Sequence, residues 1–203
     1  FAPNNGGNPE HIFSVNYDEA TGGGMNFSQM TLHYASQFTW NLEAQPWNGY
    51  AALEEFYGSY EDNDVRRASN FIVGPQLDSQ GSAVLDYATD DDKIPLNFTP
   101  QINELEPNSL REAGARLGKF SFKQFGRPDM DNNFPIVRLG EIYLIRAEAL
   151  ARNGNDWSLA LPDTNIIRAR AGVSAYTSLN AEEFLEERGR EMFQESSRRT
   201  DLI

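Results

Sequence analysis

The strongest constraint on the fold is the helical pattern of residues 136–203. Apolar residues recur there at spacings of three and four, which is the period of an amphipathic helix. Gly154 and Gly172 follow two of these runs, and glycine commonly ends a helix. Asn180 and Glu183 stand at the N-cap and N3 positions of the last run, the spacing of a capping box. We therefore predict helices over about 136–154, 159–171 and 181–196.

The predicted helices are amphipathic and joined by short connections. Pro135 suits the first position of the first helix, and Pro162 is tolerated in the second only within its first turn. The apolar side of the first helix consists of Leu139, Ile142, Tyr143, Ala147 and Leu150. That of the third consists of Phe184, Leu185, Met192 and Phe193. Short connections favour antiparallel neighbours, so this part predicts a small helical bundle.

The preceding residues, 1–135, carry most of the Gly, Pro and Asn and are typical of loops with short strands. Alternating apolar residues predict strands at 13–17 and 119–123. We divide the chain into a loop-rich segment, 1–135, and a helical segment, 136–203, both belonging to one larger domain. The expected fold class is mainly α, with a partly β, loop-rich part.

One short helix is predicted inside the loop-rich segment. Its apolar residues have helical spacing and are Leu53, Phe56, Tyr57 and Tyr60. Asn48 and Gly49, just before it, supply loop chemistry and a cap.

Composition excludes several classes of function. The 30 acidic and 17 basic side chains give a net charge of −13, which argues against nucleic-acid binding because phosphate contacts need concentrated Lys and Arg. The chain has no cysteine, which excludes a disulfide framework, a thiolate nucleophile and a cysteine zinc site. His11 and His33 are the only histidines, and neither stands in a catalytic or metal-binding motif. We expect no catalytic residue and no cofactor.

The ends of the sequence carry no visible targeting signal. The chain begins at Phe1 without Met or a signal peptide, and Ile203 follows a helical pattern directly. We interpret the sequence as an internal piece of a longer protein.

The acidic loops raise the question of a calcium site. Asp62–Asp64 and Asp90–Asp92 are acidic turns that either hold a calcium ion or are simply solvated, and the solvated turn is favoured. Asp129–Asn133 begins like a calcium loop, but Phe134 and Gly140 occupy the positions that need Gly and a bidentate Glu. An EF-hand is therefore excluded.

Charged residues are frequent on the predicted helices. They are Glu141, Arg146, Glu148, Arg168, Arg170, Glu187, Arg190, Glu191 and Arg198. Paired carboxylates can serve acid–base chemistry. Arg and Glu on packed helices more often pair with each other and fix how the helices dock, and we prefer that interpretation.

Aromatic residues in 25–50 form the most specific functional signal. Trp40–Asn41 and Trp47–Asn48 each place a large ring beside an amide, with Tyr34 nearby. Sugar rings stack their C–H faces on aromatic rings, while amides bind the hydroxyls, and loops on a rigid scaffold often hold ligand sites. The alternative is that both tryptophans are partly buried anchors, the role we assign to Trp157.

Three motifs in the helical part resemble the SusD/RagB family. They are Phe134–Ala149 (FPIVRLGEIYLIRAEA), Asn165–Gly172 (NIIRARAG), and Glu187–Glu191 followed by Glu195, Arg198, Asp201 and Leu202. Trp47–Tyr50 and Asp64–Arg66 are also similar, though less distinctive. The departures are Ser196 where the family usually has Gly, Gly189 where Arg is usual, and Pro162 within a helix.

This resemblance implies a helical, tetratricopeptide-like fold and a surface glycan-binding lipoprotein without catalytic activity. It implies a lipid anchor on the outer membrane and a SusC-like TonB-dependent transporter that receives the oligosaccharide or polysaccharide. The candidate glycan-binding residues are Trp47, Trp40, Asn48, Asn41 and Tyr34. The alternatives are a glycoside hydrolase, which would use carboxylates near aromatics, and a helical adaptor that binds the transporter without sugar. The sequence does not identify the glycan.

Overall fold

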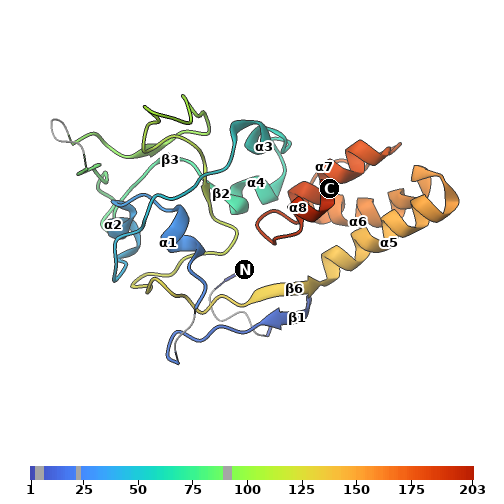
Figure 1. Ribbon diagram of the computed structural model, residues 1–203, viewed down its shortest axis with the longest axis horizontal. Coiled ribbons are helices and arrows are strands. Elements are labelled where there is room, and N and C mark those ends of the chain that lie inside the picture. The colour runs from blue at the N-terminus through green and yellow to red at the C-terminus, as the bar shows by residue number, and fades with distance from the viewer. Residues whose placement is uncertain (3–6, 22–23, 89–92) are drawn as a thin grey trace. The chain divides into compact units, whose positions relative to one another are not determined.

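The chain divides into two compact units (Figure 1). The computed structural model describes residues 1–2, 7–21, 24–88 and 93–203. The first unit contains the described residues of Phe1–Gly6, Asn16–Gly58 and Ser69–Asn133. The second contains Gly7–Val15, Ser59–Ala68 and Phe134–Ile203. The second unit thus includes two segments from the loop-rich part of the sequence.

The second unit combines one strand pair with a set of helices. Strand β1 (His11–Val15) pairs antiparallel with β6 (Phe134–Arg138), and α5 (Leu139–Gly154) begins directly after β6 (Figure 1). The helices that follow are η1 (Trp157–Ala160), α6 (Leu161–Ala171), α7 (Ala181–Glu191) and α8 (Arg198–Asp201). The predicted helices and the first predicted strand are confirmed, although β1 lies two residues before the predicted 13–17 and α7 ends five residues earlier than expected.

Local signals in the sequence set the ends of these helices. Asn180 accepts hydrogen bonds from the backbone N–H groups of Glu182 and Glu183, and the Glu183 carboxylate completes the capping box. Gly172 ends α6 in the left-handed conformation, as expected. At the end of α5 that role belongs to Asn155, the residue after Gly154. Pro162 lies in the first turn of α6.

Two predictions for the first helix are wrong. Pro135 lies in β6 and pairs with Ser14, because the β1–β6 ladder delays the start of the helix to Leu139. A two-stranded pair tolerates a proline that cannot donate to the ladder. The buried side of α5 is also rotated from the predicted one and consists of Gly140, Leu144, Ala147 and Ala151. Small residues there let α6 and η1 pack closely against α5.

The core of the second unit lies between these helices. Its buried members are Leu144, Ala147, Ala151, Ala160, Ile167, Leu179, Phe184 and Met192. Trp157 packs against this core with its ring centroid 5.4 Å from that of Phe184, which confirms its assignment to packing. The mainly α fold class is confirmed.

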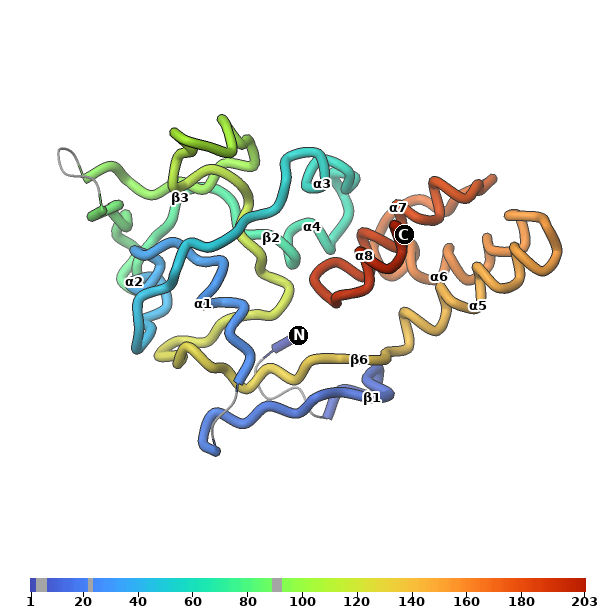
Figure 2. The backbone as a smooth tube through the Cα atoms, viewed as in Figure 1, coloured from blue at the N-terminus to red at the C-terminus, as the bar shows by residue number. Residues whose placement is uncertain are grey.

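The first unit consists of long irregular segments around short elements (Figure 2). Its helices are α1 (Phe27–Thr31), α2 (Ser36–Trp40) and α3 (Glu54–Gly58), and α4 (Val65–Asn70) spans the sequence boundary with the second unit. Strand β2 (Phe71–Ile72) pairs with β5 (Arg116–Leu117), and β3 (Gly74–Pro75) pairs with β4 (Asn97–Phe98). A core of Ala35, Val84, Leu96 and Phe98 holds these segments together.

Two predictions for the first unit are also wrong. Residues 119–123 form no strand; Phe120 is instead buried, with its ring stacked 5.0 Å from that of Phe1. Asn48 does not cap a helix, because α3 begins only at Glu54 and the Asn48 amide is used elsewhere. No helix among the described residues is long and apolar enough to cross a membrane.

The structure gives a physical setting for two of the departures from the family motifs. Ser196 has φ = 65°, a left-handed conformation that glycine adopts without steric cost. A β-carbon at Gly189 would lie 2.9 Å from Cζ of Arg198, so the Arg198 guanidinium fills the space that a larger residue would need. That guanidinium donates a hydrogen bond of 2.7 Å to the carbonyl of Leu185.

Ser196→Gly is expected to stabilise the protein by about 0.5 kcal/mol, because the steric cost of a left-handed L-residue, about 1–2 kcal/mol, exceeds the chain entropy that glycine adds to the unfolded state, about 0.4–1 kcal/mol. Urea unfolding of the two proteins measures the difference. Ser197→Gly is the matched control: Ser197 has φ = −84°, so glycine there gains nothing and adds chain entropy to the unfolded state. Equal effects of the two substitutions would contradict the prediction.

Candidate functional site

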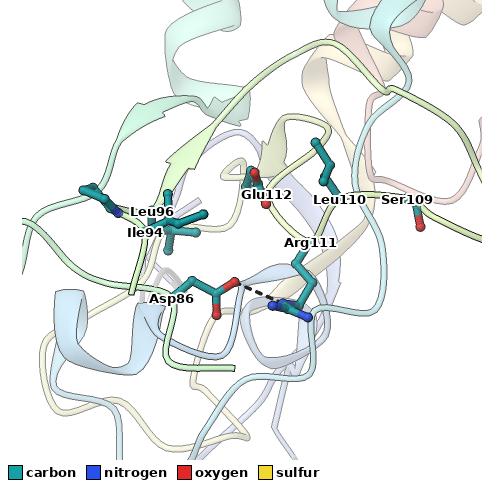
Figure 3. A pocket seen from close by; sticks show the side chains of 8 residues that line it. Asp86, Ile94, Leu96, Ser109, Leu110, Arg111 and Glu112 are labelled. Atoms are coloured by element: carbon teal, nitrogen blue, oxygen red, sulfur yellow. Dashed lines mark hydrogen bonds and ion pairs between the residues drawn. The ribbon is translucent and has the colours of Figure 1, made fainter. Parts of the chain in front are cut away.

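A small pocket in the first unit brings together polar and apolar side chains that are distant in sequence (Figure 3). Its volume is about 160 Å³. It is lined by Asp86, Ile94, Pro95, Leu96, Ser109, Leu110, Arg111 and Glu112. Leu96 belongs to the core of the unit, so the floor of the pocket is rigid.

Two of the lining residues, Asp86 and Arg111, form an ion pair. The Arg111 guanidinium donates from Nε to Oδ2 of Asp86 over 3.0 Å (Figure 3). The Arg111 side chain is 36% exposed and that of Asp86 is nearly buried. Burial alone would raise the pKa of Asp86, but the hydrogen bonds from Ala88 and Arg111 and the charge of Arg111 hold that pKa below its ordinary value. Asp86 is therefore a carboxylate at neutral pH, with Arg111 fixed beside it.

His33 lies next to the Asp86 carboxylate. Its Nδ1 accepts the N–H of Ala35 over 3.1 Å, which leaves the proton on Nε2, 3.5 Å from Oδ2 of Asp86. Burial lowers the pKa of His33, and the charges of Arg116 and Arg111 lower it further. The fully buried, neutral imidazole has no access to a substrate and serves the fold.

The turn that carries Trp47 is fastened to α1. The N–H groups of Trp47, Asn48 and Gly49 donate to the carbonyls of Gln29, Leu32 and Met30 over 2.8, 2.9 and 2.7 Å. Trp47 itself is 54% exposed. A rigid backbone thus presents a half-exposed indole, which is the arrangement a stacking residue requires.

Asn48 joins this turn to the pocket. Its Nδ2 donates to the carbonyl of Arg111 over 3.2 Å, and its Oδ1 accepts from Nη2 of Arg116 over 2.9 Å. Trp47 and the Arg111–Asp86 pair therefore belong to the same part of the first unit. Both polar atoms of the Asn48 amide are used within the chain.

The remaining predicted site residues lie on other segments. Trp40 is half-buried, with its ring edge-to-face on Phe122 at 5.1 Å. Asn41 ends α2 at φ = 49° and donates to Oε1 of Gln124 over 2.8 Å. Tyr34 is half-buried, with its ring 5.2 Å from that of His33. Trp40 and Asn41 are thus fastened to residues 122–125, whereas Trp47 and Asn48 are fastened to α1 and the pocket.

Asp86 and Arg111 were not predicted from the sequence. They lie 25 positions apart, and neither stands in a motif. The apolar run that ends at Tyr87 is the only local signal near Asp86. Since the pairing depends on tertiary contacts, no spacing rule could have found it.

Of the two acidic turns considered for calcium, the structure describes only Asp62–Asp64. Asp64 is ion-paired with Arg66 at 2.7 Å, and Asp62 with Arg67 at 2.7 Å. Asp90–Asp92 lie outside the described residues. Within the described ranges, no three His, Asp or Glu side chains are grouped as a metal site.

Several charged residues of the helical motifs form a buried network in the second unit. Glu187 is fully buried and lies 2.8 Å from Arg66 and 2.9 Å from Arg168. Arg138 pairs with Glu191 at 2.7 Å and with Glu195 at 2.5 Å. The expected mutual pairing of these residues is confirmed.

The arrangement in the first unit can bind a polyhydroxylated ligand. The Arg111–Asp86 pair offers charged donors and acceptors at a partly exposed edge, and such charge-assisted bonds are the strong ones. The Trp47 ring adds an apolar face for stacking.

Comparison with known proteins relates the helical part of the chain to one family. Residues 114–203 match the model of the SusD family, and they include all three helical motifs. This match supports membership of the SusD/RagB family. Starch-binding protein SusD of Bacteroides thetaiotaomicron is 39% identical over 74 residues, which are 36% of this chain and 13% of that protein.

Solved structures extend the likeness of fold to nearly the whole chain. A SusD-like protein of Bacteroides fragilis superposes with a TM-score of 0.64 at 19% identity, covering 96% of this chain and 43% of that one. Surface glycan-binding protein A of B. thetaiotaomicron, in complex with laminarihexaose, has a TM-score of 0.59 at 24% identity, covering 95% of this chain and 42% of that one. The chain thus spans less than half the length of these relatives. At such identities the likeness shows the fold alone.

Proposed function

We propose that this chain is part of a surface glycan-binding protein that captures oligosaccharides or polysaccharides without cleaving them. The exposed indole of Trp47 is the observation that carries the proposal, because it stands on a turn whose next residue, Asn48, is hydrogen-bonded to the carbonyl of Arg111. In the proposed mode of binding, a sugar ring stacks on the indole, and the guanidinium and the carboxylate bind hydroxyls of the same glycan. Tyr34, Trp40 and Asn41 remain candidate contacts for further rings.

The relatives support carbohydrate as the ligand class. One is a starch-binding protein, and another binds laminarihexaose. The non-catalytic part of the proposal rests on the carboxylates of the second unit. Glu187, Glu191 and Glu195 are held by arginines, so they serve the fold and are unsuited to protonate a glycosidic oxygen.

The proposal includes a place in the cell. We propose that the intact protein is lipid-anchored at the outer membrane surface and delivers its glycan to a SusC-like TonB-dependent transporter. Family membership supports both steps. Co-purification of such a transporter with the tagged protein from membranes tests the partnership.

Trp47→Ala is expected to weaken glycan binding about tenfold or more, because stacking on an aromatic ring contributes about 1–3 kcal/mol. Isothermal titration of the full-length protein against laminarin, amylopectin, mannan and xyloglucan measures it. Phe13→Ala is the control, since Phe13 is also an exposed aromatic ring but lies in the other unit. Undiminished binding by Trp47→Ala would move the site away from this turn.

Binding of none of the glycans by the unsubstituted protein would contradict the proposed function. Retained transporter binding would then favour the helical adaptor. Release of shorter sugars from a bound glycan, abolished by one Asp or Glu substitution, would favour the glycoside hydrolase.

A further inference from the structure

An exposed aromatic pair stands apart from the predicted site residues. The rings of Phe38 and Tyr87 have centroids 5.9 Å apart and planes at 74°, so the edge of one ring meets the face of the other. Phe38 is 51% exposed and Tyr87 is 40% exposed. Single exposed apolar residues are ordinary, whereas two large rings in contact on the surface offer an apolar face on which a ligand ring can stack.

The pair borders a hollow of about 320 Å³ in the first unit. The hollow is lined by Phe38, Asp78, Ala83, Val84, Leu85, Tyr87 and Lys93. Val84 is part of the core and gives the hollow a rigid apolar floor. Lys93, Asp78 and the Tyr87 hydroxyl contribute polar groups. The hollow therefore combines flat apolar walls with groups that bind hydroxyls.

This hollow and the Arg111–Asp86 pocket are lined by the same stretch of chain. Asp86 and Ile94 line the pocket, whereas Leu85, Tyr87 and Lys93 line the hollow. Leu85 and Pro95 form a β-bridge, and adjacent residues in extended chain point to opposite sides. Tyr87 lines the hollow and directly follows Asp86, which lines the pocket. The two cavities therefore lie on either side of one extended segment, and a glycan that passes over its edge reaches both.

We propose that Phe38 and Tyr87 form a second sugar-stacking subsite, which binds a ring of the same glycan beyond the rings held at Trp47 and Arg111. The proposal rests on the proposed function and adds a selection for length to it. A short oligosaccharide fills only the first site, whereas a longer one reaches the hollow. A protein partner fits less well, because stable protein interfaces cover about 800 Å² on each side and this hollow is the size of a small ligand.

The test compares two lengths of one glycan. Titration of the full-length protein with laminarihexaose and laminaritriose, or the matching pair from another panel glycan that binds more tightly, measures both affinities. Phe38→Ala and Tyr87→Ala are each expected to weaken hexasaccharide binding about tenfold, the effect of losing one stacking face, and to leave trisaccharide binding unchanged. Trp47→Ala is expected to weaken both.

Leu77→Ala is the matched control. Leu77 is 49% exposed on the same stretch but does not line the hollow, so its removal should change neither affinity. Thermal unfolding verifies that every variant is folded.

The outcomes separate this proposal from the proposed function. If Phe38→Ala and Tyr87→Ala leave hexasaccharide binding unchanged while Trp47→Ala weakens it, the second subsite is overturned and the proposed function stands. Equal weakening of both lengths also overturns it, because the rings would then belong to the first site. Absence of any glycan binding overturns both proposals. A concentration-dependent dimer of the unsubstituted protein that Phe38→Ala abolishes assigns the pair to self-association instead.

Discussion

Glu191→Gln is expected to lower the free energy of unfolding by about 3–5 kcal/mol, the usual cost of removing one partner from a buried ion pair. The carboxylate of Glu191 is nearly inaccessible and lies among three arginines of the second unit. Its partners are Arg66 at 3.1 Å, Arg138 at 2.7 Å and Arg170. The neutral amide leaves these guanidinium groups with too little negative charge around them. Urea unfolding of the full-length protein measures the loss.

The size of this effect depends on burial. A charge pair in water contributes about 0–1 kcal/mol, because solvent screens it and holding the side chains costs entropy. Glu148→Gln is the matched control, since Glu148 pairs with Arg152 at 2.7 Å across one turn of α5 in an exposed position. It should cost about 0.5 kcal/mol or less. If both substitutions cost the same, burial of the network is not what makes it important.

The helical part was largely predictable because its signals are local. The Asn180 capping box and the left-handed Gly172 each depend on residues within a few positions, so the ends of α6 and the start of α7 follow from spacing. The buried side of α5 was not predictable in the same way. Leu139 and Ile142 fit a helical period as well as Leu144 does, and only packing against α6 and η1 selects between them.

The strand errors have a related cause. Alternation at 119–123 resembles a strand, but a strand needs a partner, and the described structure instead buries Phe120 against Phe1 and Phe27. Pro135 suits a helix start equally well in isolation. Its place in β6 is decided by residues 11–15, more than a hundred positions earlier in the chain. Tertiary pairing overrode local preference at both places.

The candidate site shows the same division between local and distant signals. The sequence identified Trp47 by its type and its loop setting, and the structure places it half-exposed. Its neighbour Asn48 was predicted as a sugar contact, and the structure gives its amide two partners from distant segments. The ion pair of Asp86 with Arg111 required the folded chain, because no motif links a single Asp in one loop to a single Arg in another.

Arg116→Met is expected to destabilise the protein by about 3 kcal/mol, because several buried acceptors lose their donor at once. The Arg116 guanidinium donates to the carbonyls of Ala113 and Gly114 over 2.8 and 3.0 Å, to Oδ1 of Asn48 over 2.9 Å and to the carbonyl of Arg111. Burial lowers the pKa of Arg116 to about 10, so its charge is costly to hold. Relief of that cost offsets part of the loss, but methionine donates no hydrogen bond to the acceptors left behind.

Two further variants separate charge from hydrogen bonding in this prediction. Arg116→Lys keeps the charge but cannot reach all four acceptors, so it should fall between the methionine variant and the unsubstituted protein. Arg127→Met removes an exposed arginine of the same unit, whose Nε lies 3.7 Å from Glu43, and should cost about 0.5 kcal/mol or less. A more stable Arg116→Met would show that relief of the buried charge outweighs the lost bonds. Because Arg116 ties Asn48 to the segment of Arg111, the same variant should also weaken glycan binding, and a double-mutant cycle with Asn48→Ala measures that coupling.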